Sequence, residues 1–178
     1  MSLPLRTPAG QGPLAFADEL SAQATAAPDQ PAAPLLHLIA FQLDREEYGV
    51  AVSSVREVSR VTDITRVPHA PEHIRGVMNL RGRILPVLEL RTRVGHPPLV
   101  PGPKARVVVA EVHGRVIGLL VDAVAQVLKV PSDRVVPPPD DARAAAADYL
   151  TGVAQLDQRL IILLDLERML QPGPVPHA

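Results

Sequence analysis

The sequence contains an internal repeat, and this repeat constrains the fold more than any other feature. A shift of 69 positions lays residues 38–68 over residues 107–137 without a gap, and seven of the 31 aligned pairs are identical. A shift of 76 positions lays residues 74–94 over residues 150–170, with six identities in 21 pairs. Two glycine pairs and one proline pair recur in order. Because glycine and proline mark particular backbone conformations, the pattern indicates a repeated chain path of about 65 residues.

Composition limits how such a repeat can fold and what it can do. The chain has 178 residues, which is enough to bury a core as one domain or two small ones. Hydrophobic residues make up 47% and aromatic residues 2%, so the core must consist of Val, Leu, Ile and Ala. The absence of cysteine excludes disulfides, thiolate metal sites and a thiol nucleophile. A formal net charge of −1 predicts no general attraction to nucleic acid or to acidic membranes.

Proline-rich segments predict the domain limits. Residues 1–35 are rich in proline and alanine, which indicates a flexible N-terminal tail, and residues 171–178 indicate a C-terminal tail. Residues 95–104 contain four prolines and predict a linker between the repeats. No apolar run approaches the ~20 residues of a membrane-spanning helix, and no secretory signal is present, so we expect a cytoplasmic protein. One folded domain at 36–170 is expected, with units at 36–95 and 105–170.

Short apolar runs rich in β-forming residues predict that each repeat opens with a hairpin and closes with a long strand. The expected strands of the two repeats are Leu36–Leu43 with Arg106–Val112, Tyr48–Val52 with Val116–Val121, and Arg83–Leu90 with Arg159–Leu166. Pro86 inside one closing strand predicts an edge strand or a bulge. Valines at three-residue spacing predict a short helical turn in each of Ser53–Arg60 and Asp122–Lys129. Strands this short and this regularly punctuated are typical of small β-barrels.

One motif suggests catalysis by a metal. His69, Glu72 and His73 fit the H-x-x-E-H pattern of a zinc protease class, which requires both imidazoles on one helix. Pro71 argues against this arrangement, because it restricts the preceding residue away from helical geometry and leaves His69 outside any helix. We interpret the segment as a loop followed by a helix that begins at Pro71. No metal site and no cofactor are predicted.

A difference between the repeats points to function. The first repeat has Arg81 in the turn after Asn79-Leu80, and the second repeat has Asp157 at the same place. The repeated backbone therefore does not need a cation there. A surface turn without a function would tolerate either charge. The difference therefore does not by itself decide between a binding role for Arg81 and a plain surface turn.

Several strings resemble one known family. Residues 74–87 (IRGVMNLRGRILPV) and 149–152 (YLTG) are similar to signatures of the bacterial chemotaxis coupling protein CheW, as are residues 47–50 and 55–58. The resemblance runs in register from about Leu36 to Leu170. It implies a mainly β fold of two five-stranded SH3-like barrels with short helical segments, and no catalytic activity.

The resemblance also implies partners. Family members link the cytoplasmic tips of methyl-accepting chemoreceptors to the regulatory domain of the histidine kinase CheA. The residues that match the family's receptor groove are Val55, Glu57, Gly76, Asn79 and Arg81. An apolar groove would hold a receptor helix by burial, while Glu57 and Arg81 would fix its register through charged hydrogen bonds.

A second set of residues matches a kinase contact. The candidates are Arg134, Val136 and Asp141, and the last two replace basic and aromatic residues found in some relatives. The sequence thus predicts a cytoplasmic adaptor that is recruited to membrane-associated receptor arrays. A CheW-like scaffold with another output, such as surface motility, is the alternative. A barrel that binds nucleic acid is more remote, because no aromatic residue is interleaved with the five arginines between Arg75 and Arg93.

Overall fold

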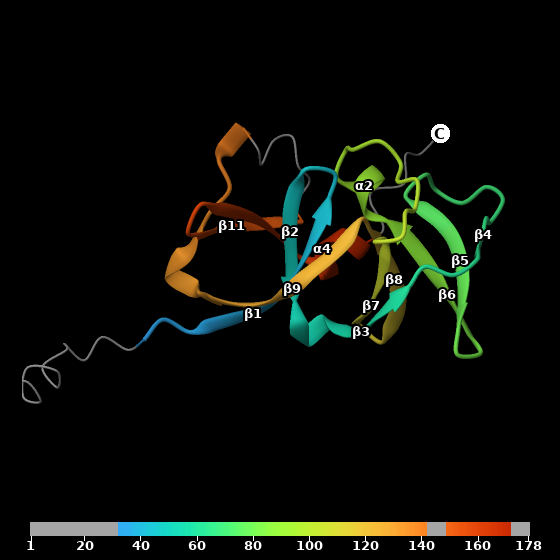
Figure 1. Ribbon diagram of the computed structural model, residues 1–178, viewed down its shortest axis with the longest axis horizontal. Coiled ribbons are helices and arrows are strands. Elements are labelled where there is room, and N and C mark those ends of the chain that lie inside the picture. The colour runs from blue at the N-terminus through green and yellow to red at the C-terminus, as the bar shows by residue number, and fades with distance from the viewer. Residues whose placement is uncertain (1–31, 142–148, 172–178) are drawn as a thin grey trace, which may run out of the picture. The chain divides into compact units, whose positions relative to one another are not determined.

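The computed structural model describes residues 32–141 and 149–171, whose strands form two six-stranded sheets (Figure 1). The predicted tails lie almost entirely outside these residues. Sheet A contains, in spatial order, β10 (Val135–Val136), β11 (Leu150–Leu156), β12 (Arg159–Leu164), β2 (Glu46–Ala51), β1 (Leu35–Leu43) and β9 (Ala123–Pro131). Sheet B contains β3 (Val55–Arg60), β7 (Arg106–Val112), β8 (Arg115–Val121), β6 (Arg83–Glu89), β5 (Ile74–Leu80) and β4 (Ile64–Thr65). The mainly β prediction is confirmed.

The two sheets do not coincide with the two repeats. The opening hairpin of the first repeat, β1–β2, pairs with strands of the second repeat, so blue and orange strands lie together in Figure 1. The hairpin β7–β8 of the second repeat likewise joins sheet B. Sheet B therefore spans residues 55–121, and sheet A combines residues 35–51 with residues 123–164. The limits expected at 36–95 and 105–170 mark the sequence repeats and not the sheets.

The exchange has a simple local cause. After β2 the chain passes through the 3-10 turn η1 (Val52–Ser54) into β3, and after β8 it passes through Asp122 into β9. Each short crossover carries the chain from one sheet to the other. The parallel pairs β12–β2 and β6–β8 then join the repeats.

Matching glycines confirm the duplication. In the parallel pairs, Gly49 lies opposite Leu163, and Gly118 lies opposite Val87. On their other sides Leu163 and Val87 face Gly152 and Gly76, each directly after a bulge. The four glycines thus occupy equivalent places in two sheets of the same strand order.

Gly76 shows why one of these positions excludes other residues. Its φ angle is +154°, and an added Cβ would lie 2.2 Å from the carbonyl oxygen of Thr65 on the neighbouring strand β4. Only a residue without a side chain permits this approach of the two backbones.

Both predicted helical turns are largely wrong. A 3-10 turn at Val52–Ser54 overlaps the first predicted turn, while Val55–Arg60 and Ala123–Pro131 are strands. The valines spaced by three lie on both faces of these strands, which leaves Val58 and Val127 exposed. Apolar residues on the solvent face of a strand imitate the period of a helix.

Two smaller expectations also need correction. Pro86 lies in β6, which is an interior strand of sheet B and not an edge strand. The bulge that was the other expectation occurs beside it, in β5 opposite Val87 and Leu88, and the pairing of β6 with β8 begins one residue after Pro86. The missing N–H of Pro86 therefore falls outside that pairing. The segment after Pro71 is a turn leading into β5 and not a helix, with the amide of Ile74 donating to the carbonyl of Pro71 at 2.9 Å.

At the end of the first alignment, the residues paired by sequence do not occupy equivalent positions in the two sheets. In sheet B, Thr65 faces Val77, and in sheet A, Val136 faces Val153, the partner of Val77 in the repeat. Thr65 is therefore the structural counterpart of Val136. The second repeat has two additional residues near η2 (Ser132–Arg134), so the identity of Val67 with Val136 is coincidental.

Three apolar clusters hold the sheets. The largest combines residues of both sheets, including Phe41, Leu119 and Leu164, with Leu90 of α2 (Leu90–Arg93) and Met169 of α4 (Leu166–Leu170). A smaller cluster lies in each sheet. The shared cluster explains why the two sheets form one folding unit although each has its own small core.

Candidate functional site

The hairpin tip between β5 and β6 places Arg81 at the surface of sheet B. Arg81 and Gly82 form its two-residue turn, with φ angles of 51° and 82°. Positive φ at both positions is the geometry of a type I′ turn, whose twist matches that of the flanking strands. The side-chain Oδ1 of Asn79 accepts a hydrogen bond from the amide of Gly82 at 2.9 Å. Asn79 therefore stabilises the turn that presents Arg81.

Arg81 meets Glu57, which comes from a distant strand. Its Nη1 atom lies 3.1 Å from Oε2 of Glu57 on β3, and the two side chains are 80% and 30% exposed. The structure thus brings together the two charged residues that the sequence analysis assigned to receptor binding. Because the Arg81 side chain is mostly exposed, its remaining N–H donors are available to a partner.

The equivalent tip of sheet A has lost this arrangement. Asp157 adopts a φ angle of 50°, which reproduces the backbone of Arg81, and Gln126 occupies the place of Glu57. Gln158 does not share the positive φ of Gly82, so only the conformation of the first turn residue is kept, while both members of the ion pair are replaced. A purely structural role for the pair would have predicted its retention in both sheets.

The other two receptor candidates are less exposed. Val55 is partly buried and packs against the shared core, and Gly76 is buried between β4 and β6. All five candidates lie in sheet B or at its hairpin tip. Gly76 has a structural requirement of its own, so its substitution would not report on binding alone.

Most arginines of the basic segment are occupied within the protein. Nη1 of Arg75 donates to Oε2 of Glu89 at 3.1 Å, and Nε of Arg91 donates to Oδ1 of Asp122 at 2.8 Å. The hydrogen bonds to Asp122 raise the pKa of Arg91. Arg93 donates to the carbonyl of Met169 at 3.0 Å. These three arginines therefore hold separate parts of the fold together, and they do not form an open cationic groove.

Sequence analysis missed Glu89. It is 3% exposed and lies at the end of β6, where Oε1 accepts a hydrogen bond from the amide of Leu99 in the linker. The repeat aligns Glu89 with Asp165, which begins α4 and accepts a hydrogen bond from the amide of Arg168. Both repeats have a carboxylate at this place, and this agreement in the alignment could have identified Glu89 from the sequence.

The kinase candidates lie in β10 of sheet A or close to it in sequence. Arg134 ends η2 and is exposed, Val136 in β10 is 49% exposed, and Asp141 is exposed shortly after β10. They belong to a different sheet from the receptor candidates. The structure therefore separates the two sets that the sequence analysis proposed.

The histidine motif does not form a helix. His69 has a φ angle of 59° in a turn, and His73 lies in the next turn, where burial lowers its pKa. Within residues 32–141 and 149–171, no group of three or more potential metal-ligating side chains comes together. In the same part of the chain, no helix is long and apolar enough to cross a membrane.

Two β sheets that exchange hairpins and share one core define the class of fold to which this chain belongs. A family model described as the CheW-like domain matches residues 37–172, and the chain belongs to this family. A probable chemotaxis protein CheW of Rhizobium etli is 38% identical, over 74% of this chain and 85% of that protein. Protein FrzA of Myxococcus xanthus is 33% identical, over 79% and 88%.

A solved structure supports the same assignment. The crystal structure of the scaffolding protein TtCheW from Thermoanaerobacter tengcongensis superposes with a TM-score of 0.71 at 32% sequence identity. The match covers 78% of this chain and 94% of that chain. The fold predicted as two SH3-like barrels is consistent with this neighbour.

Proposed function

We propose that this protein is a non-catalytic adaptor that couples the cytoplasmic tips of chemoreceptors to a CheA-type histidine kinase. Membership of the CheW-like family supports the adaptor function. The observation that carries the proposal for the receptor surface is the ion pair between Arg81 and Glu57, which the equivalent tip of sheet A lacks.

The receptor surface consists of Val55, Glu57, Gly76, Asn79 and Arg81. Val55 contributes apolar area at the edge of the shared core, and Asn79 holds the turn in place. Arg81 is a suitable interface anchor, because its planar guanidinium can bind Glu57 and a partner carboxylate at the same time. Gly76 allows β4 and β5 to approach each other beneath this surface.

The kinase surface consists of Arg134, Val136 and Asp141 on sheet A. An exposed valine between two charged residues fits the apolar centre and polar rim of a protein interface. Because the two surfaces lie on different sheets, the protein can bind a receptor and a kinase at once. In this arrangement the protein acts at receptor arrays in the cytoplasm.

The test compares both affinities in matched variants. Arg81→Asn removes the cation but keeps a residue that tolerates positive φ, and it should weaken binding of a receptor cytoplasmic fragment about thirtyfold, or about 2 kcal/mol. Asp157→Asn makes the matched change at the other tip and should leave receptor affinity unchanged. Calorimetric titration measures both, and an unchanged affinity in Arg81→Asn would refute the receptor surface.

A second pair of variants tests the kinase surface. Val136→Asp should weaken binding of the kinase regulatory domain about tenfold and leave receptor binding intact. Val67→Asp alters another exposed valine, just beyond β4, and serves as the control. Equal losses in the two variants would contradict the assignment of Val136.

A chemosensory scaffold with a different output, such as surface motility, is a second candidate. The similarity to Protein FrzA is consistent with it. The same two surfaces would be used, so the identity of the partners distinguishes the candidates. Isolation of the protein from its native cells with its bound receptors and kinase provides that identity.

A further inference from the structure

The two small cores correspond in part through the repeat, but the sheet B core also includes a residue from the linker. Val87, Val107 and Leu85 of the sheet B cluster align with Leu163, Leu38 and Ile161 of the sheet A cluster. The sheet B cluster also contains Leu99, which comes from the linker between the repeats. The sheet A cluster has no linker residue among the residues that the structure describes.

Leu99 closes the core of sheet B. It is 7% exposed, and its amide donates to Oε1 of Glu89, which is itself 3% exposed. The other carboxylate oxygen of Glu89 accepts from Arg75 at 3.1 Å. An extended segment therefore binds here through one aliphatic side chain and one backbone N–H group.

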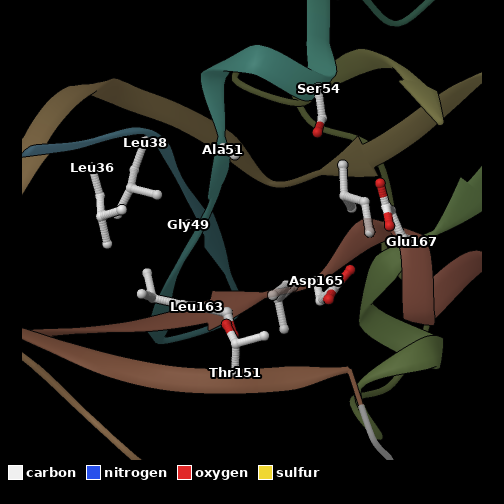
Figure 2. Close-up of a pocket in the computed structure, with 11 residues that line it drawn as sticks. Leu36, Leu38, Gly49, Ala51, Ser54, Thr151, Leu163, Asp165 and Glu167 are labelled. Atoms are coloured by element: carbon white, nitrogen blue, oxygen red, sulfur yellow. The ribbon is translucent and has the colours of Figure 1, made fainter. Parts of the chain in front are cut away.

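The equivalent place on sheet A is an open cavity of about 280 Å³. Asp165 lines it where sheet B has Glu89, and Thr151 lines it where sheet B has Arg75. Figure 2 shows Leu36 and Leu38 on one side of the cavity and the carboxylates of Asp165 and Glu167 on the other. The cavity thus combines an apolar wall with an acidic one.

The chain before β1 takes a different course from the linker before β7. Before β7, the amide of Ala105 donates to the carbonyl of Gly102 at 3.1 Å, and this turn directs Leu99 onto the core. Before β1, the backbone continues alongside β9, where the amide of Ser132 donates to the carbonyl of Pro34 at 2.9 Å. No described segment therefore covers the cavity as Leu99 covers its counterpart.

The sequence of the leader does not supply a second Leu99. The position 69 residues before Leu99 is Gln30, and the nearest leucine on its N-terminal side is Leu20. Gln30 is polar, so its side chain does not match the apolar contact that Leu99 makes in the sheet B core. This composition favours an occupant from another protein.

We propose that the sheet A cavity binds an extended, basic peptide segment of a partner protein through a leucine-sized side chain. The side chain would pack on Leu38 and Leu163, and the adjacent backbone N–H would donate to Asp165, as the amide of Leu99 donates to Glu89. Charge complementarity selects a basic segment, because Thr151 provides no cation in place of Arg75. Asp165 and Glu167 already lie 3.5 Å from Arg168 and 3.7 Å from His113, and both carboxylates remain partly exposed.

The experiment uses a synthetic peptide with the linker sequence His96–Ala105 (HPPLVPGPKA), which carries both the leucine and a lysine. Titration into the full-length, isotope-labelled protein should shift the amide resonances of Gly49, Thr151 and Leu163. A peptide with Leu99→Ala should bind about tenfold more weakly or worse, because it buries less apolar area.

Variants of the protein locate the site. Ala51→Leu fills the cavity and should abolish the shifts, whereas Ala125→Leu, at an exposed alanine outside the cavity, should not. Asp165→Asn retains a helix-capping side chain but loses the charge, and it should weaken binding, whereas Asp157→Asn should not.

Three outcomes would overturn the proposal. The first is the absence of saturable binding, which would be expected if the leader or nothing at all fills the cavity. The second is a set of shifts centred on Val87 and Leu120, which would mean that the peptide displaces the protein's own linker. The third is binding that both Ala51→Leu and Asp165→Asn leave unchanged, as a contact between two copies elsewhere on the surface would produce.

Discussion

The hairpin tips of the two sheets share the backbone conformation of the first turn residue and differ in chemistry. Arg81 and Asp157 both adopt positive φ at the first turn position. Arg81 pairs with Glu57, whereas the residue that corresponds to Glu57 in sheet A is the uncharged Gln126. The difference shows that this fold requires the turn and not its charge. A residue that differs between the two repeats is not required by the shared fold, so its side chain is free to serve binding.

A second difference lies behind the tips. Sheet B is closed by Leu99 and by buried Glu89, which pairs with the partly exposed Arg75, whereas sheet A has an open cavity at the matching place. One copy therefore has a core that its own linker closes, and the other has a cavity that no described segment covers. Three changes test how far this comparison extends.

The largest effect is expected at Gly76 in β5, where the backbones of β4 and β5 approach each other. Gly76→Ala should lower the free energy of unfolding by about 3 kcal/mol or more, because a Cβ there would lie 2.2 Å from the carbonyl oxygen of Thr65. In Gly152→Ala the nearest contact is the Val135 side chain at 2.7 Å, so a loss of about 1–2 kcal/mol is expected. Urea denaturation measures both, and equal losses would mean that the two sites are not distinguished by backbone strain.

An intermediate effect is expected at the linker. Leu99→Ala should lower the free energy of unfolding by about 2–3 kcal/mol, because it leaves a cavity in the sheet B core. Val100→Ala, at a neighbouring side chain that is 87% exposed, should change it by less than about 0.5 kcal/mol. If Leu99→Ala costs no more than Val100→Ala, the linker does not close the core, and the contrast with sheet A disappears.

The smallest effect is expected when the ion pair is transferred. The double substitution Gln126→Glu with Asp157→Arg copies Glu57 and Arg81 into sheet A, and the free energy of unfolding should change by less than about 0.5 kcal/mol, as for other exposed pairs. Chemical denaturation of the double variant and its two single variants isolates the pair. A gain above 1 kcal/mol would show that the pair is structural and would weaken the argument for a binding role.

Local signals predicted much of this structure. The hairpins, the closing strands and the repeated glycines follow from apolar runs and turn residues, and the strand pairing confirms them. The valines at three-residue spacing led to a wrong prediction at 55–60, because exposed valines such as Val58 interrupted the two-residue alternation of a buried strand. The meeting of Glu57 with Arg81 could not be derived from spacing, since it depends on how β3 lies relative to a distant hairpin.

The sequence by itself determined that one unit occurs twice, that its core is aliphatic and that its turns require particular backbone conformations. It also identified Arg81 and Asp157 as equivalent positions of opposite charge. Tertiary structure alone decided which strands share a sheet. Pairing between β2 and β12 joins residues more than 100 positions apart, and a hairpin can satisfy its outer hydrogen bonds with either repeat when both present the same edge. The short crossovers at η1 and Asp122 carry the chain between the sheets, and the course of the linker closes one core with Leu99 while no described segment closes the other.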